Sequence, residues 1–278
     1  MTVATPTLQC MRLQDRVDAP PGDAHLSVDR IQGIWRHTEP DLHGIAEVRV
    51  AADGDAPLVE ISGAGGPVPT SHLPMKASTI FAASPVSRDG TAFFVDYDYG
   101  FMKSRLQGNV NLGLLVLAGF HDFGVGSGYS NYFSREFFYT GNGGATPSMP
   151  SGLSAVTDGS ARLNHTSLLG RWRNTNARSA GIVSMEIYDR GEVLGIRAFG
   201  AGDVGVLDWG ESTARTYAKD WRSTDAMAFS ACFEFDSMRC HFQANVKQGV
   251  LVVAYFTTFQ DGSGRSNYFS REFYYKEA

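Results

Sequence analysis

The chain has few cysteines, no long apolar run and no excess of positive charge. Its 278 residues include three cysteines, Cys10, Cys232 and Cys240, and none of them forms a C-x-x-C pair, which argues against a disulfide framework and a structural zinc site. No apolar run reaches the roughly 18 residues of a membrane-spanning helix, and the first residues lack the apolar core of a secretory signal. A net charge of −5 argues against nucleic acid, because phosphate binding needs a basic face. We therefore expect a cytoplasmic protein with no membrane or nucleic-acid partner.

Several motifs of nucleotide-binding and hydrolytic enzymes are also missing. No G-x-G-x-x-G or P-loop precedes a predicted helix. The glycine-rich residues 126–130 lack the strand-to-helix context of a serine nucleophile. We expect no cofactor. The 31 glycines, 11 prolines and sparse helical periodicity instead indicate a turn-rich β protein.

The sequence contains a tandem repeat. Residues 126–139 read GSGYSNYFSREFFY, and residues 262–275 read GSGRSNYFSREFYY, an offset of 136 residues. The match extends backward, and at an offset of 137 the residues QGIWR (32–36) lie over LGRWR (169–173). The chain is therefore a duplication, and each copy ends on the same predicted strand.

The repeat defines the expected domain organisation. Residues 1–28 have no evident counterpart and are expected to form a tail or clasp. The first copy spans residues 29–140 and the second spans residues 161–278. Residues 141–160, rich in glycine, proline and serine, are expected to link them.

Each copy is predicted to consist of short β-strands bounded by turn residues. In the first copy we expect strands near residues 31–37, 45–51, 57–62, 78–83, 91–99, 102–111, 114–121 and 132–140. Short connections favour antiparallel pairing of neighbours. Eight such strands hide one apolar face by closing into a barrel, which holds side chains or one small ligand. The predicted fold class is all-β, with two tandem eight-stranded antiparallel meander barrels.

One hairpin register follows from the positions of charged residues. A two-residue turn at Gly100 and Phe101 is the length that hairpins favour. The same register in the second copy turns at Asp236 and Ser237 and places Cys232 and Cys240 on opposite faces, where they cannot form a disulfide. This register predicts four cross-strand pairs, Asp98–Lys103, Asp96–Arg105, Glu234–Arg239 and Cys232–His241.

The opening of each copy resembles a known superfamily. GIWR (33–36) and GRWR (170–173) are similar to the Gly-x-Trp signature of the calycins, the lipocalins and avidins. The resemblance implies a barrel closed at one end by Trp35 or Trp172, with Arg135 or Arg271 lying across the indole ring. WRNTNARSAGI (172–182) and the repeated ending also resemble small bacterial barrels of unknown function. The resemblance covers both copies and implies a fold; it does not imply a function.

Differences between the copies indicate candidate catalytic residues. HTEPDLH (37–43) in the first copy becomes NTNARSA (174–180) in the second, and His121, Asp122 and Asp96 become Thr257, Thr258 and Cys232. In a meander barrel these positions are expected to share one mouth, where a histidine beside a carboxylate is the usual acid–base pair. The same residues also fit an ordinary solvated loop, and the spacing of the two loop histidines across a turn does not favour a metal. The predicted catalytic residues are His37, Glu39, His43, Asp96 and His121, with Asp41 and Asp122 nearby.

Other repeated or aromatic positions have more modest interpretations. Identical residues in the two copies are expected to serve the scaffold, and Glu136 and Glu272 are expected to face neighbouring arginines. Aromatic side chains on strands belong to the core by default, although a subset lining a cavity would suit an apolar ligand. The predicted ligand-binding residues are Tyr97, Tyr99, Arg105, Phe233 and His241.

Two main hypotheses for function remain open. Tandem calycin-like barrels resemble cofactor-free cyclases, isomerases and hydratases of natural-product pathways, in which a cavity folds an apolar substrate and polar groups move a proton. The alternative is a carrier or sensor that only binds a small hydrophobic molecule. A lectin-like or protein-binding module is a third possibility. We expect a small apolar ligand or substrate, and a monomer or homodimer.

Overall fold

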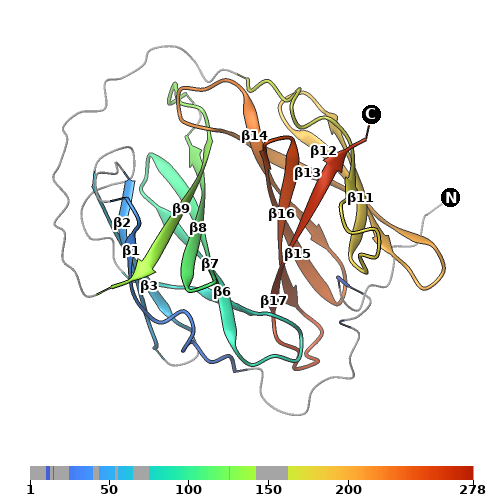
Figure 1. Cartoon of the computed structure of the whole chain (residues 1–278). Coiled ribbons are helices and arrows are strands. Elements are labelled where there is room, and N and C mark those ends of the chain that lie inside the picture. The colour runs from blue at the N-terminus through green and yellow to red at the C-terminus, as the bar shows by residue number, and fades with distance from the viewer. Residues whose placement is uncertain are drawn as a thin grey trace. The chain divides into compact units, whose positions relative to one another are not determined.

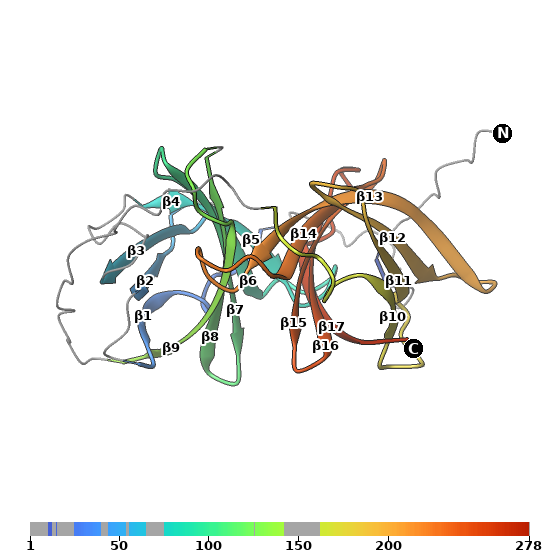
Figure 2. The ribbon, with the colours of Figure 1, turned by 90° about the horizontal axis from the view of Figure 1, so that it is seen from above.

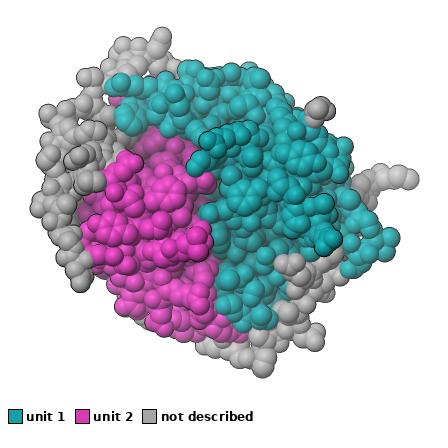
Figure 3. Space-filling model, viewed as in Figure 1, with its two compact units in different colours: residues 1–24, 82–87, 162–278 teal, residues 25–81, 88–161 magenta. Residues whose placement is uncertain are grey.

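The computed structural model describes residues 11–12, 15, 25–39, 44–53, 56–64, 75–124, 126–141 and 162–277. This part of the chain is all-β, with 17 strands and no α-helix, which confirms the all-β part of the predicted class (Figure 1). The chain forms two compact units, coloured separately in Figure 3. The first-copy unit contains residues 25–81 and 88–161, and the second-copy unit contains residues 1–24, 82–87 and 162–278. No helix within the described ranges is long and apolar enough to cross a membrane.

The first copy contributes nine strand segments. Neighbours pair antiparallel from β1 to β4 and from β6 to β9, and β9 pairs with β1. The short β4 and β5 lie between β3 and β6 in the strand order. The segments are β1 (Gly33–His37), β2 (Gly44–Ala51), β3 (Leu58–Ala64), β4 (Lys76–Ala77), β5 (Thr79–Ala82), β6 (Gly90–Asp98), β7 (Met102–Asn111), β8 (Leu114–Phe123) and β9 (Tyr132–Thr140).

The second copy contributes eight strands, which can be followed in Figure 2. Each pairs antiparallel with the next, and β17 pairs with β10, so that the ladder returns on itself. They are β10 (Gly170–Asn174), β11 (Ile182–Asp189), β12 (Leu194–Ala201), β13 (Val206–Ala218), β14 (Ala226–Glu234), β15 (Met238–Lys247), β16 (Val250–Phe259) and β17 (Tyr268–Lys276).

The predicted hairpin register is confirmed in both copies. β6 and β7 pair Asp96 with Arg105 and Asp98 with Lys103, while β14 and β15 pair Glu234 with Arg239. Cys232 lies opposite His241, and both Cys232 and Cys240 are free thiols. The alternation of charged and apolar residues set this register, because a slip of one residue would bury the charges.

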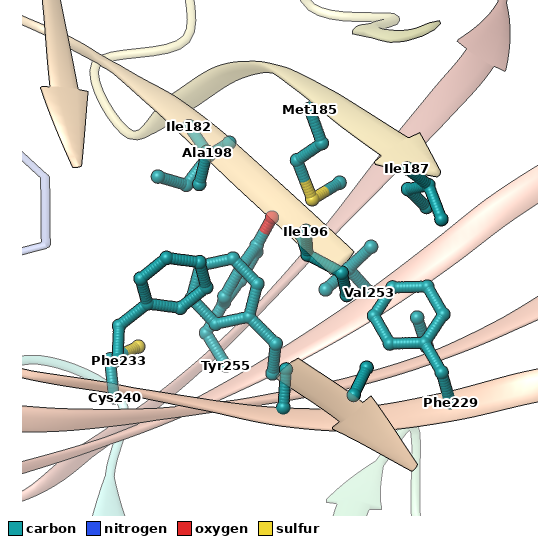
Figure 4. Packing of buried hydrophobic residues seen from close by; sticks show 14 of the residues in the cluster. Ile182, Met185, Ile187, Ile196, Ala198, Phe229, Phe233, Cys240, Val253 and Tyr255 are labelled. Atoms are coloured by element: carbon teal, nitrogen blue, oxygen red, sulfur yellow. The ribbon is translucent and has the colours of Figure 1, made fainter. Parts of the chain in front are cut away.

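The core of the second-copy unit lies on the inner face of its strands. Figure 4 shows Ile196, Phe233 and Tyr255 packed among other apolar side chains of this cluster. Tyr255 and Ile196 are fully buried, and Phe233 is 3% exposed. Burial of this apolar surface is the main stabilising term, at roughly 25 cal/mol per Å².

The Gly-x-Trp openings have a local explanation. Gly33 and Gly170 adopt φ angles of 130° and 120°, which side chains rarely tolerate. Two residues later, Trp35 and Trp172 turn inward and donate their Nε1–H groups to backbone carbonyls at 2.8 Å in both cases. Each tryptophan is 3% exposed or less. The glycine therefore sets the path by which the indole enters the core.

The expected stacking of arginine on these tryptophans is wrong. Arg135 lies over the Phe133 ring at 5.5 Å from its centroid, and Arg271 lies over Phe269 at 5.4 Å. The register explains the difference: Trp35 pairs with Thr140, and Arg135, an odd number of residues away on β9, points to the opposite face. A lysine lies over the second tryptophan instead, with Lys276 Nζ at 5.8 Å.

The two copies also share an isolated bridge outside their strands. Ser27 forms an isolated bridge with Asp89, and Asn164 forms the same bridge with Asp225. Ser27 and Asn164 are 137 residues apart, and Asp89 and Asp225 are 136 apart, so the two bridges lie at equivalent places in the repeat. The predicted linker falls almost wholly outside the described residues.

Candidate functional site

Four polar side chains form a row across strands β6 to β9 of the first-copy unit. Tyr97, Ser104, His121 and Tyr132 are successive Cα partners in three neighbouring strand pairs. Cα partners in antiparallel strands point to the same face, so these side chains lie next to one another. Each is buried, with 1% to 6% of its surface exposed. Buried polar groups need hydrogen-bond partners, because an unpaired one costs free energy.

His121 is held on both ring nitrogens. Nδ1 lies 2.7 Å from Oγ of Ser104, and Nε2 lies 3.2 Å from Oγ of Ser134. The ring also stacks on Tyr132, with centroids 4.3 Å apart. Burial lowers the pKa of His121 to about 3, because the interior disfavours the imidazolium. The ring is therefore neutral near pH 7, with one nitrogen donating and the other accepting.

Gly119 makes room for this imidazole. A Cβ atom at Gly119 would lie 2.4 Å from Nε2 of His121 and 2.6 Å from Oγ of Ser134. Both distances are far below van der Waals contact. In the second copy the equivalent residues are Tyr255 and Thr257, so the glycine and the histidine changed together.

One further tyrosine, Tyr99, extends the polar row beyond Tyr97 at its β6 end. Tyr97 donates its hydroxyl to the carbonyl of Val59 at 2.7 Å and stacks on Tyr99, with centroids 6.2 Å apart. Burial raises the pKa of Tyr99, an effect that the nearby Ser104 hydroxyl partly offsets. The Tyr99 hydroxyl is nonetheless buried and makes no hydrogen bond of ordinary geometry to the described residues. It is a polar atom that a bound molecule can satisfy.

Glu136 is another buried polar group without a complete set of partners. It lies on β9 on the same face as Tyr132 and Ser134, two residues from Ser134, and its Cα partner is Leu117. The residue is only partly buried as a whole, but its Oε2 atom is inaccessible and has no partner in the described part of the chain. Desolvation raises the pKa of Glu136 to about 7, although a backbone hydrogen bond at Ile45 lowers it in part.

The equivalent carboxylate in the second copy is fully engaged. Glu272 accepts hydrogen bonds from Asn174 Nδ2 at 2.9 Å, Ser179 Oγ at 2.9 Å and the Tyr274 hydroxyl at 2.8 Å. The Tyr274 hydroxyl also bonds to that of Tyr255. The hydrogen-bond donors to Glu272 are thus one amide and two hydroxyl groups.

The first copy carries other residues at the positions of these donors. The residues equivalent to Asn174, Ser179, Tyr274 and Tyr255 are His37, Leu42, Phe138 and Gly119. Phe138 and Gly119 have no side-chain hydroxyl, so two phenols near the carboxylate are absent. Within the described residues, Oε2 of Glu136 therefore has no partner, whereas Glu272 accepts three side-chain hydrogen bonds.

Side chains on the inner face are also smaller in the first copy at several positions. The second copy fills its interior with Tyr255, Met185 and Ile187, which Figure 4 shows within one cluster. The substitutions, first copy before second, are Gly119/Tyr255, Leu106/Phe242, Val48/Met185 and Val50/Ile187. The site in the first-copy unit is therefore less filled by its own side chains at these positions.

The predicted catalytic loop lies beside this face only in part. His37 is the Cα partner of Phe138 and packs its ring edge against it at 5.0 Å between centroids. Its Nδ1 accepts the backbone N–H of Glu39 at 2.9 Å, and the Glu39 side chain is exposed. His37 therefore stabilises a local turn. His43 and Asp41 lie outside the described residues.

Three other predicted residues lie on the outer face. Asp96 and Arg105 form a two-pronged ion pair at 2.7 Å, and Arg105 covers the Phe94 ring at 4.9 Å. His241 faces the Cys232 sulfur at 4.0 Å on the outer face of β14 and β15. These residues are not brought together with His121. An exposed ion pair of this kind contributes about 0.2–1 kcal/mol.

Of the predicted ligand-binding residues, only the tyrosines reach the polar row. Tyr97 and Tyr99 lie there, whereas Phe233 belongs to the packed core of the second-copy unit, 4.6 Å from the Phe242 ring. The residues that the sequence reasoning missed are Ser104, Gly119, Tyr132, Ser134 and Glu136. The coupled exchange of Gly119 and His121 for Tyr255 and Thr257 was the signal that could have identified this face.

The part of the chain that the structure describes contains no group of three or more histidine, cysteine or carboxylate side chains placed to hold a metal ion.

Comparisons with known proteins leave the family open. No protein-family profile matches the chain, and no curated protein matches it. A solved structure of a protein of unknown function from the DUF3598 family of Nostoc punctiforme is similar over 89% of this chain and 97% of its own. The identity is 10% and the TM-score 0.34.

Proposed function

We propose that the first-copy unit binds a small, largely apolar molecule on the inner face of its sheet and converts it by proton transfer. In this proposal each copy closes as a calycin-like barrel, and the first barrel holds the substrate. The reaction class is that of a cofactor-free cyclase, isomerase or hydratase. An eight-stranded barrel has an interior wide enough for one small ligand.

The contrast between Glu136 and Glu272 carries the proposal. One carboxylate has three side-chain donors, and the other keeps an inaccessible Oε2 without a partner in the described residues. Leaving a buried polar group unpaired costs about 1–3 kcal/mol, and more when it is charged. A feature that costs stability in one copy and is absent from the other indicates a function in the copy that has it.

The pKa of Glu136 suits acid–base work. A group whose pKa of about 7 lies near the working pH exists in both protonation states, as general acid–base catalysis requires. The protonated carboxyl would give its proton to a carbon–carbon double bond or a carbonyl oxygen of the substrate. The carboxylate so formed would then take a proton from a neighbouring carbon, which completes an isomerisation with no net change in protons.

His121 has a different role in this proposal. With a pKa of about 3, it is a poor base near pH 7. Held between two serine hydroxyls, it presents a neutral, fixed ring that orients the substrate against Glu136. Positioning of this kind supplies several kcal/mol of the barrier reduction.

A carrier that only binds its ligand is the second candidate. It is favoured by the complete engagement of His121, since both ring nitrogens already have serine partners. A carrier needs an apolar site in which the polar groups are already paired. A titrating carboxyl group contributes nothing to such binding. The two candidates therefore differ in what a change at Glu136 does.

The experiment begins with small molecules released from the purified, denatured protein and identified by mass spectrometry. We expect one apolar compound per chain from the wild type and none from the double variant Gly119→Tyr/His121→Thr, which copies the second-copy residues. The compound is then incubated with fresh protein in D₂O. Deuterium incorporation that falls about 100-fold in Glu136→Gln but not in Glu272→Gln supports the enzyme. Binding without exchange by the wild type supports the carrier, and no bound compound contradicts both.

A further inference from the structure

In the second-copy unit, a side chain from the N-terminal segment occupies part of the apolar core. Met11 is 3% exposed and belongs to the apolar core of this unit. Its backbone N–H donates to the hydroxyl of Tyr268 at 3.0 Å, and its sulfur lies 3.9 Å from the hydroxyl of Ser270. An apolar side chain from the N-terminal segment thus fills space beside the inner residues of β17.

The next residue brings a positive charge to the same place. The Arg12 guanidinium lies 5.5 Å from the centre of the Tyr268 ring and pairs with Asp15 at 2.6 Å. A Cβ atom added at Gly181 would meet Oε1 of Glu272 at 3.1 Å, Cγ of Arg12 at 3.2 Å and Cε of Met11 at 3.3 Å. The carboxylate, the arginine stem and the methionine therefore converge on one point.

The first copy has the same residues at the positions that contact Met11 and Arg12 in the second copy. Tyr132, Ser134 and Glu136 are identical to Tyr268, Ser270 and Glu272. In the described part of the first-copy unit, however, no segment occupies the position equivalent to that of Met11 and Arg12. The lysine and arginine residues of β7 and β9 alternate onto the outer face, so that the inner face of β6 to β9 has no cation to match Glu136.

We propose that the ligand of the first-copy unit is an apolar molecule that carries a protonated nitrogen, an alkylamine or alkylguanidine in chemical class. Its hydrocarbon part takes the place that Met11 has in the other unit, and its cation binds Glu136 as Arg12 approaches Glu272. This inference rests on the proposed function in one respect, that the inner face of the first-copy unit is the binding site.

Three physical features favour a cation over a neutral alcohol. A buried carboxylate is stabilised far more by an opposite charge within about 4 Å than by one neutral hydrogen bond. The neighbouring ring of Tyr132 attracts a cation by its π face, as Tyr268 does for Arg12. The unpartnered Oε2 of Glu136 and the hydroxyl of Tyr99 are both acceptors that a guanidinium or ammonium can fill.

The test uses three probes with the same hydrocarbon chain, octylguanidinium, 1-octanol and octanoate, each below its micelle concentration. Isothermal titration calorimetry at pH 8 measures binding to the full-length protein. We expect octylguanidinium to bind at one site per chain, at least tenfold more tightly than octanol, and octanoate to bind most weakly. The Glu136→Gln variant should lose at least tenfold in affinity for octylguanidinium and little for octanol. The matched Glu272→Gln variant should bind the three probes with the affinities of the wild type.

The outcomes separate this inference from the proposed function. If octanol binds as tightly as octylguanidinium, and the Gly119→Tyr/His121→Thr variant abolishes both, the cationic class is overturned while the binding site stands. If no probe binds to a variant-sensitive site, both proposals fail. Should Glu136→Gln lower the thermal midpoint, Glu136→Asp provides a second variant that keeps the charge; it must retain the preference for the cation.

Discussion

Gly119 and His121, two residues apart on β8, share one volume. The imidazole of His121 turns back along the strand so that a Cβ atom at Gly119 would lie 2.4 Å from its Nε2. The hydrogen bond between His121 and Ser134 therefore requires a residue without a Cβ atom at position 119. In the second copy a tyrosine and a threonine solve the same packing problem without a buried imidazole.

The Gly119→Ala substitution should displace this ring. We expect a loss of about 1–3 kcal/mol in the free energy of unfolding, the usual cost of overpacking a core, as measured by urea denaturation. The double variant Gly119→Ala/His121→Thr should recover most of that loss, because the smaller threonine vacates the contested space. If the effects of the two substitutions simply add, the residues do not compete for one volume.

Glu136 should make stability fall with rising pH. Its folded-state pKa of about 7 lies above the usual value of 4.5, so between these values the folded state holds a proton that the unfolded state has released. The carboxyl group therefore costs nothing below about pH 4.5, and its cost grows until about pH 7, to roughly 3 kcal/mol at most. We expect Glu136→Gln to be more stable relative to the wild type at pH 8 than at pH 5.

Chemical denaturation at the two pH values measures this difference. The matched variant Glu272→Gln removes a carboxylate that accepts three side-chain hydrogen bonds, so it should destabilise the protein. If the difference between Glu136→Gln and the wild type is the same at pH 5 and pH 8, the carboxyl group does not titrate in this range.

Trp172 and Arg271 should act independently. The tryptophan points inward and donates to the Leu168 carbonyl at 2.8 Å, whereas the arginine covers Phe269 on the other face of the sheet. Trp172→Phe should cost about 1–3 kcal/mol through the unpaired carbonyl and lost packing, and Arg271→Gln should cost less than 1 kcal/mol. In a double-mutant cycle the two effects should add to within about 0.5 kcal/mol. A coupling energy above about 1 kcal/mol would indicate that the arginine and the tryptophan are in contact.

Cys240 should resist alkylation in the native protein. It is fully buried beside the Thr257 hydroxyl at 3.5 Å, and burial raises the pKa of its thiol to about 12. Alkylation requires the thiolate, so iodoacetamide at pH 8 should modify Cys240 only after unfolding. The partly buried Cys232 on the outer face provides the internal comparison, read by peptide mass spectrometry. Equal labelling rates for Cys232 and Cys240 would contradict the inner-face position of Cys240.

The strands were predictable because their signals are local. β7 and β9 have the bounds that the sequence predicts, and the Asp96–Arg105 register follows from the alternation of charged and apolar residues. The duplication helped, since two sequences had to satisfy the same pattern. The predicted contact between Trp35 and Arg135 was wrong because it was inferred from the resemblance to calycins. The strand register places these two side chains on opposite faces.

The candidate site was only partly within reach of the sequence. By itself the sequence determined the repeat, the all-β class and the register of the β6–β7 and β14–β15 hairpins, and it singled out His121, Tyr97 and Tyr99, which the structure places on one face. Only the tertiary structure decided that Ser104 and Ser134 bracket the ring of His121, and that Oε2 of Glu136 has no partner among the described residues while Glu272 accepts three hydrogen bonds. The physical reason is that the partners of a buried polar group come from strands and loops far apart in the chain, and the pKa of a carboxyl group depends on all of them together.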